Sequence, residues 1–116
     1  MNDRRDPFDG PDLHGQTYSR ANMSQTNFDG VNLSESRFFA VLSDASFRDT
    51  NLSRAEFDDV NLSEARFHDI NLQNARFDNI NFSNVSISNA NLQGMTINGI
   101  LVTELLDAFA AQTGKN

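Results

Sequence analysis

Large apolar side chains recur at every fifth position along most of the chain. The series runs in steps of five from Phe8 to Phe38, and again from Leu42 to Ile97, giving nineteen positions. A single step of four, between Phe38 and Leu42, interrupts it. A small or aliphatic residue stands two positions before most of these residues in the second block, and polar residues fill the remaining positions. The chain therefore consists mostly of five-residue units, and we call the large apolar residue of each unit its centre.

A period of five excludes the two common regular structures. Five residues advance an α-helix by about 500°, so successive centres would never form one apolar stripe. In one long strand an odd period would place alternate centres on opposite faces. The period instead predicts a very short strand followed by a turn in every unit. The centre and the small residue two positions before it point inward, and the polar residues favour the turns.

Two units carry the pattern with particular clarity, namely Ala-Asn-Leu-Gln-Gly at 90–94 and Ala-Asn-Met-Ser-Gln at 21–25. They resemble the unit of the pentapeptide repeat family, roughly Ala-(Asp/Asn)-Leu-X-X, and similar units run from about residue 6 to residue 99. The resemblance implies an all-β solenoid, specifically a right-handed quadrilateral β-helix with four units per coil. Nineteen units would give about five coils, stacked at strand spacing over roughly 23 Å.

With four units per coil, the alternation of Phe and Leu centres predicts columns of equivalent residues on successive coils. Two opposite faces would stack Phe, and the other two would stack mainly Leu. The predicted Phe columns are Phe28, Phe47 and Phe67, and Phe38, Phe57 and Phe77. The predicted Leu columns are Leu33, Leu52, Leu72 and Leu92, and Leu42 and Leu62 with Met23 and Phe82 at the ends.

The step of four puts an aromatic residue, Phe39, into an outward position. One interpretation is a shortened corner in which a neighbouring turn partly covers Phe39. The other is a kink that presents an exposed aromatic anchor to a partner. Both interpretations remain open at the level of the sequence.

The last residues predict a different element. After Gly99, Thr103 is a good helix N-cap, and residues 104–112 read as a short helix closed by Gly114 and Lys115. We therefore expect a disordered N-terminus (1–6), a β-helix (7–99) and a C-terminal helical segment (100–116). The helix would cover the open end of the core. Related family members dimerise through their C-terminal ends, which implies a candidate homodimer interface formed by Leu105, Leu106 and Phe109.

Composition excludes several functions. The chain has no cysteine, one lysine and a net charge of −7, so we expect neither a thiolate metal site nor nucleic-acid binding. It has no long apolar run and no signal-peptide pattern, which favours a cytoplasmic protein without a membrane segment.

His14 and His68 are expected at the surface, outside any metal cluster. Five Asn-X-Ser motifs follow from the repeat pattern itself: Asn22, Asn32, Asn51, Asn61 and Asn81. No catalytic set or cofactor motif is visible, and we expect no enzyme, cofactor or metal.

The acidic surface is the remaining functional clue. The four-unit coil predicts a partner-binding face made by Glu56, Asp58, Asp59 and Asp78, with Asp44 and Glu64 on the next face. Some members of the family mimic DNA and bind DNA gyrase or topoisomerase IV, protecting these enzymes against quinolones. Duplex DNA carries about 14 charges over ~23 Å, whereas this chain carries −7 and places Arg20, Arg37 and Arg76 on the same face.

Three functional hypotheses follow. The first is a non-catalytic scaffold or protein-interaction module with an unidentified protein partner. The second is a DNA-mimicking inhibitor or protector of DNA gyrase or topoisomerase IV. The third is an assembly module that stacks end to end through its coil ends.

Overall fold

The computed structural model describes residues 8–114, and short β-strands make up most of its regular structure. The N-terminal residues 1–6, expected to be disordered, and Lys115, expected after the helix, lie outside the described residues. The chain divides into two compact units, one ending at Val85 and the other beginning at Ser86. Each unit is described by itself.

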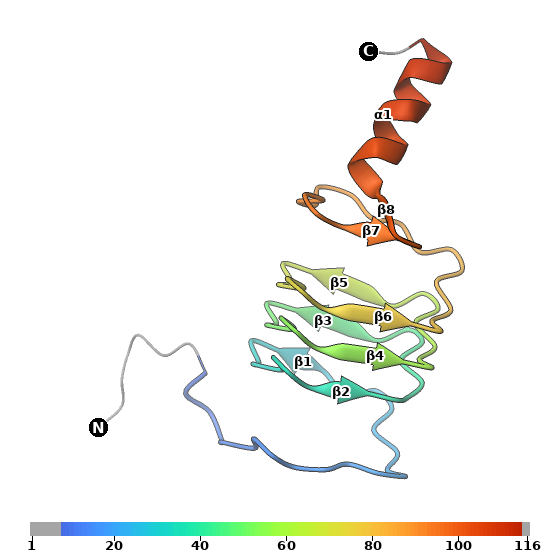
Figure 1. Cartoon of the computed structure of the whole chain (residues 1–116). Helices are drawn as coiled ribbons and strands as arrows, with labels where there is room; N and C mark the ends of the chain where they lie inside the picture. The colour runs from blue at the N-terminus through green and yellow to red at the C-terminus, as the bar shows by residue number, and fades with distance from the viewer. Residues whose placement is uncertain (1–7, 115–116) are drawn as a thin grey trace. The chain divides into compact units, whose positions relative to one another are not determined.

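The first unit contains two three-stranded parallel sheets (Figure 1). One sheet consists of β1 (Phe28–Asp29), β3 (Ser46–Arg48) and β5 (Arg66–His68). The other consists of β2 (Arg37–Phe38), β4 (Glu56–Asp58) and β6 (Arg76–Asp78). Strands that are consecutive in the chain belong to different sheets, because a turn follows every strand and redirects the chain. This is the arrangement of a β-solenoid.

The strand register gives the length of one coil. Phe47 pairs with Phe67, and Phe57 pairs with Phe77, each twenty positions further along the chain. Three of the four isolated parallel bridges keep the same spacing, as between Asn51 and Asn71. Four units therefore form one coil, as the resemblance to the family implies, and pairs that span the step of four, such as Phe28 with Phe47, are nineteen positions apart.

The predicted Phe columns are confirmed by ring stacking. The rings of Phe47 and Phe67 are 4.9 Å apart and 2° from parallel, and those of Phe57 and Phe77 are 4.6 Å apart at 8°. Phe28 and Phe38 continue the two columns at 5.5 and 4.7 Å. The bridges place the middle members of the Leu columns in register as well: Leu33, Leu52 and Leu72, and Leu42, Leu62 and Phe82.

Inward side chains fill the middle coils. Phe47 and Leu52 are fully buried, Phe57 and Leu62 are 1% exposed, and Ala55 and Val60 complete the core. The one buried polar side chain of the described residues is Thr50, whose hydroxyl donates to the carbonyl of Arg48 at 2.7 Å. The core therefore has no unpaired buried side-chain polar atom among the described residues. Burial decreases toward the last coil, where Phe77 is 37% exposed.

The corners share a backbone conformation that the sequence did not reveal. The residue two positions after almost every centre has a positive φ, for example Arg54 at 57°, Asp59 at 53° and Glu64 at 57°. For residues with a Cβ atom, this left-handed region costs roughly 1–2 kcal/mol. Asn, Asp and Gly tolerate it best, which explains their frequency at these positions. No β-branched residue of the described chain adopts it.

A substitution at one corner tests this conformation. We expect Glu64→Val to lower the free energy of unfolding by roughly 1 kcal/mol, because a β-branched residue is strained at positive φ. Glu64→Gly should not lower it, and urea denaturation measures both variants. Glu64→Asn is the control, because it removes the same charge with a residue that tolerates positive φ. Equal losses for Glu64→Val and Glu64→Asn would contradict the explanation.

The step of four omits one left-handed corner residue. Phe38 pairs with Phe57 nineteen positions on, whereas Val41 already bridges Asn61 at the normal spacing of twenty. The spacing of twenty is thus restored between Phe38 and Val41, and the corner between these two residues is one residue shorter than the others. Phe39 is 78% exposed, so a neighbouring turn does not cover it. The structure supports the exposed aromatic residue and not the covered one.

The ends of the predicted repeat depart from a regular coil. Residues 8–27 contain no strand or bridge, although the units continue through them, and Figure 1 shows them as an extended trace. The centres Leu13, Tyr18 and Met23 are 61%, 59% and 41% exposed. Parallel pairing in the described residues is confined to Phe28–Asn81. Met23, expected at the end of a Leu column, is therefore not buried in one.

The second unit consists of an antiparallel hairpin and a helix. Strands β7 (Thr96–Ile97) and β8 (Ile100–Leu101) are joined by Asn98 and Gly99, whose φ values of 49° and 81° are those of a type I′ turn. This hairpin was not predicted from the sequence, although Asn-Gly is the usual signature of such a turn.

Helix α1 (Val102–Thr113) follows β8 directly. Thr103 was predicted to be its N-cap, with the helix beginning at Glu104, and this was wrong. The N-cap is Leu101, which stays extended as the last residue of β8 and makes no side-chain cap hydrogen bond. Gly114 ends the helix as predicted, with φ 77° and its N–H directed at the carbonyls of Ala110 and Ala111. No helix among the described residues is long and apolar enough to cross a membrane.

Candidate functional site

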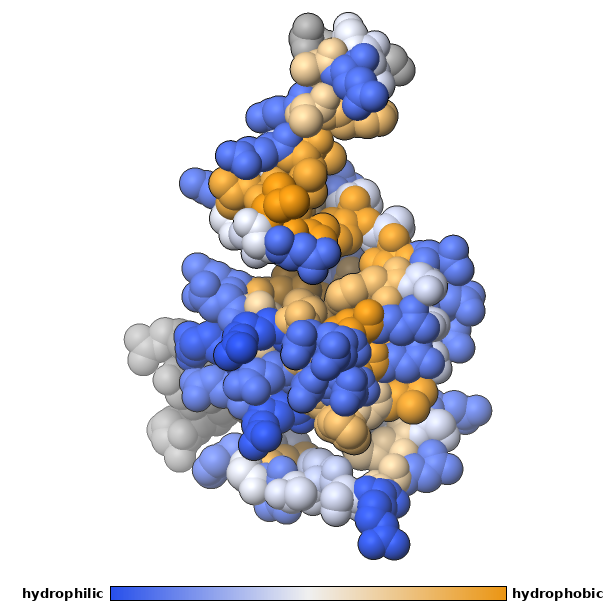
Figure 2. All heavy atoms as spheres, turned by 45° about the vertical axis from the view of Figure 1, so that its right-hand side comes forward, coloured by the Kyte–Doolittle hydropathy of each residue, from blue (hydrophilic) through white to orange (hydrophobic). Residues whose placement is uncertain are grey.

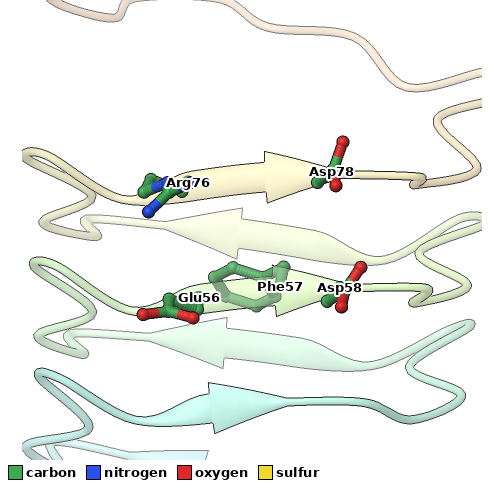
Figure 3. A pocket seen from close by; sticks show the side chains of 5 residues that line it. All are labelled: Glu56, Phe57, Asp58, Arg76 and Asp78. Carbon is green, nitrogen blue, oxygen red and sulfur yellow. The ribbon is translucent and has the colours of Figure 1, made fainter.

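The predicted acidic face lies on β4, β6 and the corner that follows β4. Asp58 is in register with Asp78, and the N–H of Asp59 donates to the carbonyl of Asp78 at 3.2 Å. Figure 3 shows Asp58 and Asp78 at one end of the two strands and Glu56 and Arg76 at the other. All four carboxylates of this face are exposed. Register therefore brings Asp58, Asp59 and Asp78 together on one part of the face.

Basic side chains interrupt the other part of the same face. Glu56 pairs in register with Arg37 on one side and with Arg76 on the other. Adjacent strands lie about 4.8 Å apart, so this column alternates in charge at short range. Opposite charges in neighbouring strands stabilise a sheet, whereas the carboxylates of Asp58 and Asp78 repel each other. The face is therefore a mixed surface with an acidic end, and not a uniform array of negative charge.

The remaining two predicted acidic residues occupy corners of the next face. Asp44 and Glu64 both have positive φ, at 58° and 57°. The N–H of Asp44 donates to the carbonyl of Ser63 at 2.9 Å, so Asp44 lies beside Glu64 on the neighbouring coil. Asp59 also has a left-handed backbone, with φ 53°. Three of the six predicted acidic residues thus occupy positions where the turn itself favours a short polar side chain.

Two hollows border the acidic face: a large one of about 2710 Å³, lined mainly by residues between 8 and 46 together with Glu56 and Asp58, and a small one. The small hollow measures about 110 Å³ and is lined by Glu56, Phe57, Asp58, Arg76 and Asp78. Pockets that hold small molecules are typically about 300–1,000 Å³. Phe57 closes the small hollow from below, with 1% of its surface exposed. The small hollow therefore cannot enclose a substrate.

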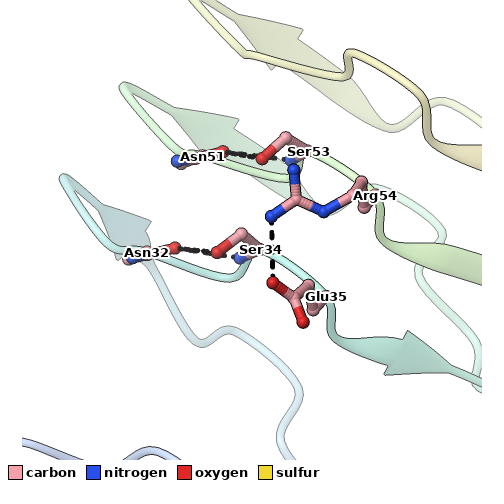
Figure 4. A network of polar contacts seen from close by, with 6 residues as sticks. All are labelled: Asn32, Ser34, Glu35, Asn51, Ser53 and Arg54. Carbon is pink, nitrogen blue, oxygen red and sulfur yellow. Dashed lines mark hydrogen bonds and ion pairs between the residues drawn. The ribbon is translucent and has the colours of Figure 1, made fainter.

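The Asn-X-Ser motifs have a structural explanation. In each of them the Oδ1 atom of Asn accepts the backbone N–H two residues later, as in the pairs Asn32–Ser34 and Asn51–Ser53, both at 3.0 Å (Figure 4). The hydroxyls of both Ser residues donate to the same Oδ1 atoms, at 2.7 and 2.8 Å. Asn71 makes the same turn with Gln73, so the turn depends on the Asn side chain and does not require a Ser two residues later.

Neighbouring turns on this face are also linked by charge. Arg54 donates to Glu35 at 2.9 Å, and these residues occupy equivalent corners of successive coils (Figure 4). Both side chains are more than half exposed, so the pair contributes little to stability. Like the Asn turns, this contact serves the fold.

The two histidines lie at the surface. The side chains of His14 and His68 are 90% and 74% exposed. Asp12 accepts a hydrogen bond from the His14 side chain and from its backbone N–H, and both bonds lower the pKa of the Asp12 carboxyl. In the described part of the chain, no group of three or more His, Cys, Asp or Glu residues is placed to hold a metal ion.

The candidate dimer residues lie on α1. Leu105, Leu106 and Phe109 are 43%, 52% and 64% exposed, whereas Val102 at the start of the helix is buried. Figure 2 shows hydrophobic surface gathered on this helical unit. The predicted apolar stripe is therefore present and remains largely uncovered within the single chain.

The shortened corner adds a feature that the sequence analysis found only in part. Val41 occupies the position that Asn61 and Asn81 hold on the following coils, and it is 74% exposed. Together with Phe39 it places two apolar side chains on the outside of the solenoid. The signal in the sequence was an aliphatic residue in a position otherwise held by Asn.

Stacked parallel strands, twenty-residue coils and a filled interior define a β-solenoid built from five-residue units. A family model described as a pentapeptide repeat region matches residues 39–105, and one described as pentapeptide repeats, with eight copies, matches residues 10–41. The chain belongs to the pentapeptide repeat family. Searches of curated proteins and of solved structures gave no match.

Proposed function

We propose that this protein is a non-catalytic scaffold or interaction module whose outward side chains contact a protein partner. The observation that carries the proposal is the filled interior: Phe47, Leu52, Phe57 and Leu62 are at most 1% exposed. The hollow of about 110 Å³ on the acidic face is itself too small to enclose a substrate. Flat faces of turns and short strands suit contact with another macromolecule better than chemistry in a cleft.

We infer a right-handed, four-sided β-helix of nearly five coils as the complete fold. The twenty-residue register supports four sides. Residues 8–27 carry the local geometry of further units, because Gly15, Arg20 and Gln25 have positive φ and Asn22 makes the usual turn with Ser24. Continued at the same spacing, Leu13 would lie over Leu33 and Tyr18 over Phe38.

The proposal gives the C-terminal helix two compatible roles: the capping role that the sequence predicts, and a homodimer interface through Leu105, Leu106 and Phe109. The exposure of these side chains supports the second role, because covering them would remove apolar surface from water.

A DNA-mimicking inhibitor of gyrase or topoisomerase IV is the second candidate. The cluster formed by Asp58, Asp59 and Asp78 favours it. The alternation of Arg37, Glu56 and Arg76 on the same face disfavours it, since a mimic of the duplex needs closely spaced charge of one sign.

A gyrase supercoiling assay with the purified protein distinguishes the two candidates. We expect no inhibition at micromolar concentration, because the charge is both too sparse and mixed in sign. A known inhibitor is the positive control, and an Arg37→Glu/Arg76→Glu variant tests whether a more uniform acidic face creates inhibition. Inhibition by the wild type, lost in an Asp58→Asn/Asp78→Asn variant, would instead establish the DNA mimic.

A further inference from the structure

The shortened corner between β2 and the Leu42 unit carries the two most exposed large hydrophobic residues of the described chain. Phe39 is 78% exposed and Val41 is 74% exposed, against 64% for Phe109 on the helix. Being two residues apart, their Cα atoms lie within about 7 Å of each other. They form one small apolar surface, which we call the Phe39–Val41 corner.

The fold does not require apolar residues at these two positions. Phe39 follows Phe38, which pairs with Phe57, so its counterpart on the next coil is Asp58. Val41 bridges Asn61, whose Oδ1 atom accepts the N–H of Ser63 at 2.9 Å. A valine side chain accepts no hydrogen bond, so the turn at Val41 lacks this support. The corner therefore departs from the repeat pattern at a cost to the turn, and this departure at two neighbouring positions, more than their exposure alone, makes the corner a candidate contact site.

The surroundings of the corner indicate what kind of partner fits. The two faces that meet there carry the acidic residues already described: Asp44, Glu56, Asp58, Asp59, Glu64 and Asp78. Arg37 and Arg76 are the basic residues of the described strands on these faces. Asp58 lies one strand spacing from Phe39, about 4.8 Å, and Asp44 lies three residues after Val41. An apolar spot within a net acidic surface is complementary to an apolar side chain flanked by basic ones.

We propose that the Phe39–Val41 corner binds a protein segment in which an apolar side chain is flanked by arginine or lysine residues. The apolar side chain of the partner packs on Phe39 and Val41, and its basic side chains reach Asp58 on one face and Asp44 on the other. This arrangement has the usual form of an interface, with an apolar centre and a charged rim. The inference rests on the proposed interaction role and names the chemistry of the partner.

A matched variant makes the proposal testable without damaging the fold. Phe39→Asp/Val41→Asn gives the corner the residues found at Asp58 and Asn61. The probes are three fluorescent peptides: a central leucine with two arginines on each side, the same peptide with serine at the centre, and one with glutamates in place of the arginines. We expect the wild type to bind the first peptide at least tenfold more tightly than the other two, measured by anisotropy at fixed salt concentration.

The variant should bind the arginine–leucine peptide at least tenfold more weakly and should unfold at the same or a higher temperature. Ala111→Asp, which adds a carboxylate to an exposed position of the helix outside its apolar stripe, is the control and should bind like the wild type. Equal binding by the corner variant, equal binding of the serine peptide, or no binding of any peptide would overturn the proposal. So would a wild-type dimer that only the corner variant dissociates, because a second copy would then occupy the corner. Failure of the scaffold role, as opposed to failure of the corner, is recognised separately: inhibition in the supercoiling assay would establish the DNA mimic instead.

Discussion

Replacing Phe57 by alanine should lower the free energy of unfolding by about 3–5 kcal/mol, the range measured for removing a buried aromatic side chain. Phe57 is 1% exposed, and its ring is stacked between Phe38 and Phe77 at 4.7 and 4.6 Å. Its loss would open a cavity at the centre of the column and remove both stacking contacts. Urea denaturation followed by circular dichroism measures the loss.

Phe77→Ala is the matched control for this prediction. Phe77 belongs to the same column but is 37% exposed, so its removal takes less apolar surface from the core and leaves a more open space. The loss should be clearly smaller than that for Phe57. Equal losses, or no loss for Phe57→Ala, would contradict the filling of the coils that we describe.

The second large effect concerns the oligomeric state. We expect the wild type to sediment as a homodimer and Phe109→Asp to sediment as a monomer. Phe109 is 64% exposed in the single chain and lies with Leu105 and Leu106 on one stripe of α1. A carboxylate placed in the middle of an apolar interface would lose its hydration on association, which is costly without a partner. Sedimentation velocity at several concentrations measures the change.

Ala111→Asp provides the control for the helix. It introduces the same charge into α1, but at about 100° per residue its side chain is directed about 160° away from Phe109 and about 120° away from Leu105. This variant should remain a dimer, and both variants should retain the circular dichroism of the wild type. If wild type and Phe109→Asp sediment as the same species, the stripe is not a dimer interface.

The inward half of the structure could be read from the sequence. The centres stack as predicted, with Phe28, Phe47 and Phe67 in one column, because the period of five places every centre inward and four units per coil bring every fourth centre into register. The twenty-residue coil came from the resemblance to the family and is confirmed by the register. The units in residues 8–27 form no strand or bridge. Two of their inward positions, two residues before the centres Leu13 and Tyr18, are held by Pro11 and Gln16 and not by a small or aliphatic residue.

The outward half was less predictable, because turns depend on backbone conformation more than on hydrophobic pattern. Residues as different as Arg54, Asp59 and Glu64 share a left-handed backbone, so no single residue type marks the corners. The hairpin of β7 and β8 was missed, although Asn98-Gly99 signals it, because the repeat pattern was extended through it. The extended Leu101 then displaced the helix start from the position predicted at Thr103.

The candidate surface was predicted in its acidic part and missed in its apolar part. Asp58 and Asp78 were assigned to one face from the coil length alone, and their register agrees. Phe39 was recognised as anomalous, but its exposure could not be decided without coordinates. Val41 was overlooked because valine is common at other positions of the unit. Only the bridge between Val41 and Asn61 shows that Val41 occupies an outward position of the coil.

The constant register of the coils also has a consequence for folding kinetics. Every inter-coil pairing, from Phe28 with Phe47 to Asn61 with Asn81, joins residues nineteen or twenty positions apart. Loop closure over a fixed distance costs the same entropy at each step, and it does not grow with the length of the chain. Each added coil thus extends an existing template, so duplication of a twenty-residue segment should lengthen the protein without slowing its search for the native state.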